Sequence, residues 1–189
     1  MFRLAAVTFL AVLAVSCVSR IPPSMLDQPT WRDDPELGYR ETYDQFEQAL
    51  FQSQLVWRER GIMPSVGKQA ELRLMRVVAD DDGPIVFVGH VEILFPGDNG
   101  FTRARIGYDG QVDELNSLVH HYYEREWVGD IVPALNVAFE LTPNQVQALA
   151  EANRPAIRLS NEDVGTEVTI ELAIDDQSRV TYFISRTTD

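Results

Sequence analysis

The chain has 189 residues, a formal net charge of −13 at pH 7 and a single cysteine. Phosphate backbones and anionic lipid headgroups repel such an acidic surface, which argues against nucleic acid and against an electrostatic membrane patch as partners. One cysteine allows no disulfide within the chain, and a chain of this length can bury a core without a metal or a disulfide to support it.

The N-terminal segment has the pattern of a secretory signal. Arg3 supplies a positive charge, the apolar run 4–15 follows, and the small residue Ser16 precedes Cys17. A membrane-spanning helix needs about 20 apolar residues, which is more than this run contains. The segment therefore predicts a signal peptide over residues 1–16.

Residues 14–17, Ala-Val-Ser-Cys, resemble the lipobox of bacterial lipoproteins. The resemblance implies that the Cys17 thiol receives a diacylglycerol, that the signal is cut just before it, and that the new amino group is acylated. Each buried methylene of a lipid chain contributes about 0.8 kcal/mol, so two or three chains hold a domain on a bilayer. Proteobacterial lipoproteins of the inner membrane usually carry Asp after the cysteine. Val18 stands there, which implies the periplasmic side of the outer membrane, with the inner membrane as the alternative.

Residues 17–38 have the composition of a tether between the lipid and a folded domain. They contain several prolines among polar residues and show no apolar period. A flexible coil of about 19 residues spans roughly 25 Å, so the domain can stand away from the lipid. We expect one globular domain over residues 39–189.

The first part of this domain predicts a helix and then a hairpin. Aromatic and apolar residues recur at helical spacing from Tyr39 to Leu50, which predicts a helix over this range, although the residues after it would also suit a short strand. The apolar runs 71–78 and 85–95 flank an Asp- and Gly-containing turn and predict a β-hairpin. The second strand is apolar on both faces through Val88, so we expect it to be central.

A third strand and a second helix are expected next. Apolar and polar residues alternate over 102–108, which is typical of a strand. Val112, Leu115, Leu118 or Val119, and Tyr122 recur every three or four residues, which predicts a helix over about 113–126.

The clearest local signal lies at the start of a third helix. Thr142 suits the N-cap, Pro143 suits the first helical position, and Gln145 completes a capping box. Leu141 and Val146 can form a hydrophobic staple around this start. The sequence predicts a helix from Thr142 to near residue 153.

The C-terminal part predicts strands. Residues 156–159 suit a short strand, and the alternating runs 166–174 and 180–184 predict a final hairpin. The expected fold class is α+β, with a mainly antiparallel sheet and about three helices packed on it in a single domain.

The sequence contains no standard catalytic, nucleotide-binding or metal-binding motif. One cluster stands out, because His120 and Glu124 would share a face of the predicted helix. These two side chains can bind zinc, but a site needs a further ligand, so we predict no metal and no cofactor. His90, on the expected central strand, is interpreted as a histidine at the edge of the core with one nitrogen hydrogen-bonded.

Two functions remain open from the sequence. The first is a non-catalytic, lipid-anchored envelope protein whose acidic domain binds a protein partner or forms part of an assembly. The alternative is a lipid-anchored hydrolase or small-ligand carrier with a cleft near His90, His120 and Glu124. Convergence of His90 with His120 or His121 in one pocket would favour the alternative.

Overall fold

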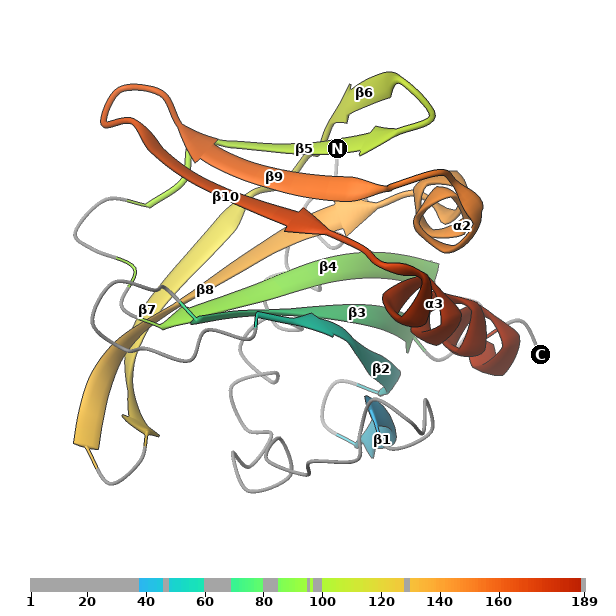
Figure 1. Cartoon of the computed structure of the whole chain (residues 1–189). Coiled ribbons are helices and arrows are strands. Elements are labelled where there is room, and N and C mark those ends of the chain that lie inside the picture. The colour runs from blue at the N-terminus through green and yellow to red at the C-terminus, as the bar shows by residue number, and fades with distance from the viewer. Residues whose placement is uncertain are drawn as a thin grey trace, which may run out of the picture.

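The computed structural model describes residues 38–45, 48–59, 69–79, 85–94, 96, 100–127 and 130–187. The predicted signal peptide, Cys17 and all but the last residue of the predicted tether lie outside this part of the chain. Within it, ten strands form two antiparallel sheets, and two helices pack beside them (Figure 1). The chain is thus α+β and mainly antiparallel, as expected. Neither described helix is long and apolar enough to cross a bilayer.

The larger sheet has six strands in the order β1-β2-β3-β4-β8-β7. The strands are β1 Tyr39–Asp44, β2 Ala49–Arg58, β3 Gln69–Ala79, β4 Ile85–Leu94, β7 Val119–Trp127 and β8 Asp130–Leu141. The predicted β3–β4 hairpin is confirmed, with Val78 opposite Ile85 next to the turn. β4 also pairs with β8 on its other side, so it is central, as its apolar sequence indicates.

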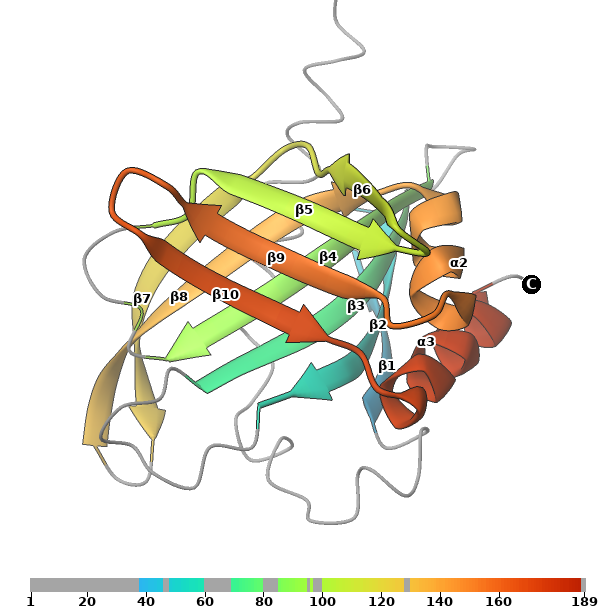
Figure 2. The same ribbon diagram turned by 45° about the horizontal axis from the view of Figure 1, so that its top comes forward.

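The smaller sheet has four strands in the order β10-β9-β5-β6. The strands are β5 Arg103–Tyr108, β6 Gln111–Glu114, β9 Ala156–Asn161 and β10 Thr166–Glu171. This sheet lies across one face of the larger sheet (Figure 2). We call that face of the larger sheet the inner face, and the opposite face the outer face.

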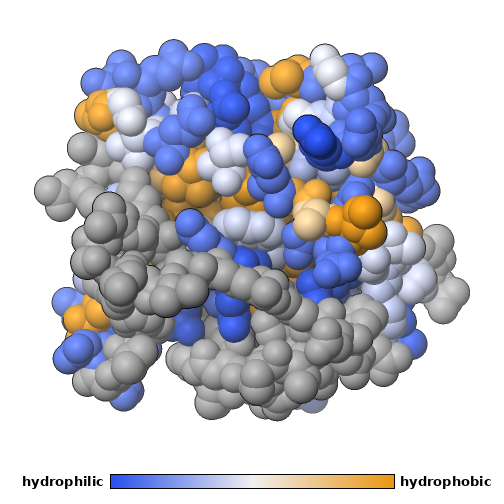
Figure 3. Space-filling model, viewed as in Figure 1, coloured by the Kyte–Doolittle hydropathy of each residue, from blue (hydrophilic) through white to orange (hydrophobic). Residues whose placement is uncertain are grey.

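The main core fills the space between the two sheets. Alternate residues of the larger sheet supply its inner face, and alternate residues of the smaller sheet meet them. The buried side chains include Leu72, Leu74, Val91, Ile93, Leu135, Val137 and Phe139 from the larger sheet and Ala104, Ile106, Ile157, Leu159 and Ile170 from the smaller one. The solvent side of the smaller sheet carries ion pairs such as Arg158 with Glu167, and the surface over β9 and β10 is mostly hydrophilic (Figure 3).

Helices α2 (Pro143–Glu151) and α3 (Ile174–Thr187) lie together at one end of the sandwich (Figure 1). The ring of Phe183 on α3 meets the edge of Phe87 on β4, with the ring centroids 6.4 Å apart. Tyr182 meets Tyr39 of β1 in the same edge-on manner at 6.0 Å. α3 therefore joins the first strand to the middle of the larger sheet.

The predicted start of α2 is confirmed in detail. The Thr142 hydroxyl accepts from the backbone N–H of Gln145 at 3.2 Å, and the Gln145 side chain accepts from the Thr142 N–H at 2.9 Å. The C-terminal end of α2 is capped from α3, because Gln177 Nε2 donates to the backbone oxygens of Ala150 and Ala152 at 3.2 and 2.8 Å. These carbonyls have no partner within their own helix, so α3 completes α2.

The helix predicted over Tyr39–Leu50 is wrong. These residues form β1 and the start of β2, and Gln48 turns the chain between them with a φ of 48°. β2 pairs with β3 on its other side. A strand here gives partners to the backbone groups along β3, which a helix would leave unpaired, so tertiary pairing outweighs the helical spacing of the aromatic residues.

The helix predicted over 113–126 is also wrong. The segment forms the end of β6 and most of β7, which pairs with β8 from Val119 opposite Ala138 to Trp127 opposite Asp130. Valine, tyrosine and tryptophan favour strands, and β8 offers a complete row of backbone partners. The periodicity over this segment was therefore misleading.

The predicted last strand, 180–184, is wrong because the segment belongs to α3. Its buried residues, Arg179, Val180, Phe183 and Thr187, follow helical spacing. At the helix start, the Asp176 side chain accepts from the backbone N–H of Ala173 at 3.0 Å. An acidic side chain at this end satisfies free N–H groups and interacts well with the helix dipole. α2 and α3 are the two helices of the described part, against about three predicted.

Candidate functional site

The residues singled out from the sequence do not meet in one place. In the register of the larger sheet, His90 on β4 lies opposite Ala138, and Ala138 lies opposite Val119. His121 is two residues from Val119 and shares the outer face with His90, because alternate residues of a strand share a face. His120 and Glu124 lie on the other face of β7. The cleft proposed near His90, His120 and Glu124 is therefore not assembled.

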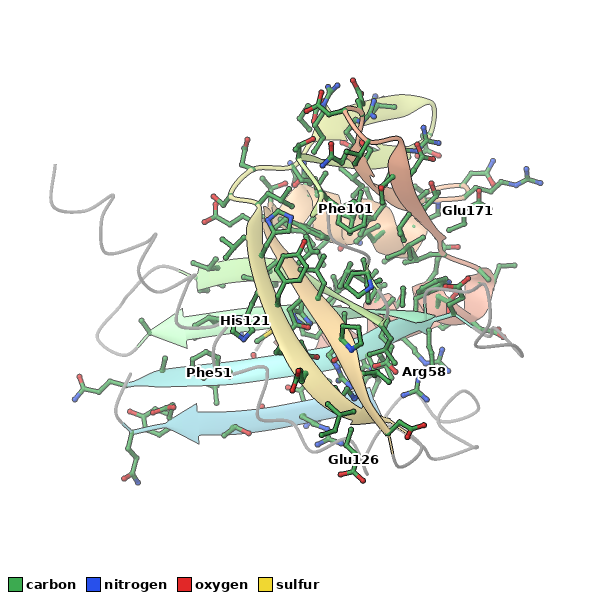
Figure 4. The ribbon with its side chains drawn as sticks, turned by 90° about the vertical axis from the view of Figure 1, so that its left-hand side faces the viewer. Phe51, Arg58, Phe101, His121, Glu126 and Glu171 are labelled. Atoms are coloured by element: carbon green, nitrogen blue, oxygen red, sulfur yellow. The ribbon has the colours of Figure 1, made fainter. Side chains whose placement is uncertain are left out.

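His120 has a structural contact. Its Nε2 accepts a hydrogen bond of 3.2 Å from the backbone N–H of Phe101, and burial lowers the pKa of the ring. Figure 4 shows His121 and Phe101 on opposite sides of β7. Glu124 is exposed, and residues four apart on a strand are separated by about 13 Å, so Glu124 cannot share a metal ion with His120. In the part of the chain that is described, no three His, Cys, Asp or Glu side chains are grouped to hold a metal.

The end of the β7–β8 hairpin extends beyond the smaller sheet (Figure 1). Tyr122 is 49% exposed and Ile131 is 73% exposed, and both lie on the side of the hairpin that continues the inner face. Glu126 lies directly opposite Ile131 near the end of the hairpin (Figure 4). Two large apolar side chains are thus open to solvent beside acidic groups. We call Tyr122, Glu124, Glu126 and Ile131 the hairpin surface.

The outer face of the same sheet carries a group of polar side chains, three of which are buried. They occupy two neighbouring rows that run across β3, β4, β8 and β7. One row contains Arg73 opposite His90, and the next contains Glu71, Glu92, Asn136 and His121. We call these six residues the polar band. Arg73, His90 and Asn136 are 6%, 2% and 1% exposed.

Two ion pairs lie at the margins of the polar band. Arg58 Nε is 2.7 Å from Glu71 Oε1, and Arg125 on β7 pairs with Glu92 on β4. The second pair spans the intervening strand β8, so β7 curls toward the outer face. In Figure 4 the β7–β8 hairpin crosses β1–β3 at a steep angle. The sheet is therefore bent around the polar band.

Three side chains of the polar band have polar atoms without hydrogen bonds. Arg73 Nη1, both ring nitrogens of His90 and Asn136 Oδ1 are buried and have no partner. His90 was expected to have one bonded nitrogen; the Asn136 side chain lies close enough to interact with the ring, but neither nitrogen makes a well-formed hydrogen bond. Buried polar groups are nearly always paired, and exceptions mark places where water, an ion or a ligand completes the site.

Burial sets the protonation of these groups. Burial, and secondarily the nearby charge of Arg73, lowers the pKa of His90 to about 3, so the ring is neutral near pH 7. Burial lowers the pKa of Arg73 to about 10, which leaves the guanidinium charged. Burial also raises the pKa of Tyr123, which lies beside Asn136, to about 12. The outer face thus presents a neutral imidazole beside a fixed positive charge.

Analysis of the sequence missed Arg73 and Asn136. Each of them stands between two apolar residues of a strand, and this alternation usually indicates a polar side chain that faces solvent. A signal was present, however, because Asn136 stands between Leu135 and Val137 in a strand that is apolar on both sides. A lone polar residue in such a strand is buried whichever face it occupies.

Comparisons with protein-family models, with curated proteins and with solved structures give no significant match to this chain. The function is therefore inferred from the residues and their arrangement.

Proposed function

We propose that this chain is a lipid-anchored protein on the periplasmic side of a bacterial outer membrane, and that its domain binds a protein partner through the hairpin surface. The observation that carries the binding proposal is the exposure of Tyr122 and Ile131 on a hairpin that extends beyond the rest of the sandwich. Exposed aromatic and aliphatic side chains on a projecting element are typical of protein interfaces.

The anchoring part of the proposal rests on the sequence Ala-Val-Ser-Cys at residues 14–17. The lipid on Cys17 would supply the membrane affinity, because the net charge of −13 opposes adsorption to an anionic surface. Val18 after the cysteine favours the outer membrane over the inner membrane.

The charge of the hairpin surface indicates the chemistry of the partner. Glu124 and Glu126 lie beside the exposed apolar side chains, and Asp130 begins β8 at the same end. A partner with a basic rim around an apolar patch would match this surface. Such complementarity speeds association and disfavours other acidic proteins.

A hydrolase is less well supported than a binding protein. The histidines and Glu124, which a hydrolytic cleft would need, are divided between the two faces of one sheet. A general base must lie within hydrogen-bonding reach of the group it activates, and His90 and His120 cannot both reach one substrate across the sheet.

The anchoring proposal is tested by metabolic labelling with a radioactive fatty acid. The wild-type chain should take up label and fractionate with the outer membrane, whereas Cys17→Ala should remain unlabelled and uncut. A wild-type chain without label would show that residues 1–17 are not a lipoprotein signal.

The binding proposal is tested by cross-linking in intact cells. The double variant Tyr122→Ser/Ile131→Ser should lose a cross-linked species that the wild type forms. Val112→Ser is the matched control, because Val112 is 67% exposed but lies on β6 of the other sheet. Loss of the species in the control, or its persistence in the double variant, would rule out the hairpin surface.

A further inference from the structure

Arg73 is a buried cation that forms no direct ion pair with a described residue, although the Glu71 carboxylate lies near enough to favour its charge. It is 6% exposed, and its Nη1 has no hydrogen bond. The carboxylates of the polar band form their ion pairs with other arginines, Glu71 with Arg58 and Glu92 with Arg125. A buried charge without a partner is strongly destabilising, so this position gains much from an anion.

The charges around Arg73 make the position attractive to an anion even in this acidic chain. Arg40, Arg58 and Arg125 are close enough to disfavour the charge of Arg73, whereas Glu71 is the carboxylate that favours it. Among the described residues that act on Arg73, positive groups therefore outnumber negative ones. An added anion would interact favourably with several guanidinium groups in a region of low dielectric constant.

His90 and Asn136 supply further polar groups beside Arg73. The neutral imidazole has one N–H that can donate and one nitrogen that can accept, and neither makes a well-formed hydrogen bond, although the Asn136 side chain lies nearby. A bound oxyanion can accept from both Arg73 and the imidazole N–H. Hydrogen bonds in which the donor or the acceptor is ionised are stronger than neutral ones, so these two bonds would fix the position of the oxyanion.

Apolar side chains flank the polar band on both sides. Met75, Val88 and Ala138 form one small cluster, and Leu94, Val132 and Ala134 form another. The outer face thus combines a positive centre with apolar surroundings. Inorganic phosphate matches only the first of these features.

The geometry points to a binding site for the carboxylate of a small amphipathic organic acid, with Arg73 as its counter-ion and the flanking apolar clusters in contact with its hydrocarbon part. A carboxylate is planar and carries a single charge, which suits the two-pronged donor geometry of one arginine. A doubly charged phosphate would lose more solvation on entering this buried position.

This site is independent of the proposed protein-binding surface. The polar band lies on the outer face, and Tyr122 and Ile131 lie on the side that continues the inner face. Failure of one proposal therefore leaves the other unaffected.

Calorimetric titration of the full mature chain in a non-ionic detergent tests the inference with three probes at constant ionic strength. Hexanoate supplies the carboxylate and the hydrocarbon, hexanol supplies the hydrocarbon alone, and inorganic phosphate supplies an anion alone. Hexanoate should bind saturably and at least about tenfold more tightly than either of the others, because it alone matches both features.

Variants at two arginines of β3 separate the site from general effects of charge. Arg73→Met should weaken hexanoate binding by about tenfold or more, and Arg73→Lys should retain part of it because the charge remains. Arg76→Met is the control, because Arg76 lies on the same strand but on the opposite face, where it donates to Gln52 at 2.8 Å. It should bind hexanoate like the wild type.

The thermal stability of the variant in the absence of hexanoate is also informative. Without hexanoate, Arg73→Met should melt no lower than the wild type, since an unpaired buried charge has been removed. If that variant does not fold, His90→Leu takes its place with the same expected loss of binding. Equal binding by the wild type and the variant, equal binding of hexanol, tighter binding of phosphate, or no saturable binding at all would each overturn the inference.

Discussion

On the inner face of the larger sheet, Phe139 and Ile93 pack against the apolar side chains of the smaller sheet, whereas two rows of the outer face carry Arg73, His90 and Asn136. All five residues are almost fully buried. Phe139 and Ile93 need no hydrogen-bond partner, whereas Arg73, His90 and Asn136 carry buried polar atoms whose partners are missing. Alternation of side chains along a strand therefore assigns residues to two faces, but it does not show which face is exposed to solvent.

The largest expected effect is the loss of an aromatic ring from the inner face. Phe139→Ala should reduce the free energy of unfolding by about 3 to 5 kcal/mol, because the ring is 1% exposed and its removal leaves a cavity. Urea unfolding measures this change. Ile131→Ala, at a position 73% exposed, is the control and should change stability by less than about 0.5 kcal/mol. Similar losses in both variants would mean that the inner face is not the principal core.

Adding an atom to the same face should also destabilise the domain. Gly89 lies opposite Phe139, and a Cβ at Gly89 would come within 2.1 Å of the Phe139 ring. Gly89→Ala should therefore cost about 3 kcal/mol. The double variant Gly89→Ala/Phe139→Leu should be more stable than the sum of the two single changes predicts, since the smaller side chain relieves the clash. Additive losses would place the clash elsewhere.

The buried histidine of the outer face should make the stability of the domain depend on pH. The pKa of His90 is lowered from 6.5 to about 3 in the folded chain. Between these two pH values, His90 is protonated in the unfolded chain but remains neutral in the folded chain. Stability is therefore lost as the pH falls from 6.5 toward 3. At pH 5 the loss from this group is about 2 kcal/mol relative to pH 7.

Unfolding of the wild type and of His90→Gln at both pH values isolates this contribution, because the carboxylates titrate in both proteins. The wild type should lose about 2 kcal/mol more than the variant between pH 7 and pH 5. Parallel losses would show that His90 is protonated in the folded chain at pH 5.

The smallest effect is expected at the cap of α2, away from both faces. Thr142→Ala should cost about 1 kcal/mol, because the N–H of Gln145 loses its acceptor. Thr181→Ala on the exposed side of α3 is the control, and it should leave the urea midpoint nearly unchanged since alanine favours a helix. A Thr142 effect as large as that of Phe139 would mean that the cap also supports the sheets.

The elements that could be predicted from the sequence are those with local signals. The pairing of the neighbouring strands β3 and β4 and the cap formed by Thr142 and Gln145 each act within a short stretch of chain, so the sequence alone indicates them. β7 and α3 could not be predicted in this way. The spacing of Val112, Leu115 and Tyr122 suited a helix, and the alternation of Val180, Tyr182 and Ile184 suited a strand, but packing partners far along the chain decided both.

The candidate sites divide in the same way. The central position of His90 followed from the apolar sequence of β4, which is a local property. Its pairing with Arg73 and its separation from His120 depend on strand order and register, which no single segment specifies. Arg73 drew no attention because a charged residue between two leucines is typical of a solvent-facing position.

The strand order has a consequence for how the domain acquires its structure. β5 and β6 precede β8 in the chain but belong to the other sheet, and β7 and β8 precede β9 and β10, which complete the sheet that β5 begins. The larger sheet requires Phe87 to pair with Leu141, and the smaller sheet requires Arg103 to pair with Ser160. In each pair the second residue comes more than about fifty positions later in the chain. The apolar inner face of the larger sheet is buried only by the smaller sheet, so the two should form in one cooperative step, at the slow rate typical of chains whose contacts are remote in sequence. During synthesis, the chain would therefore stay open until β10 had emerged.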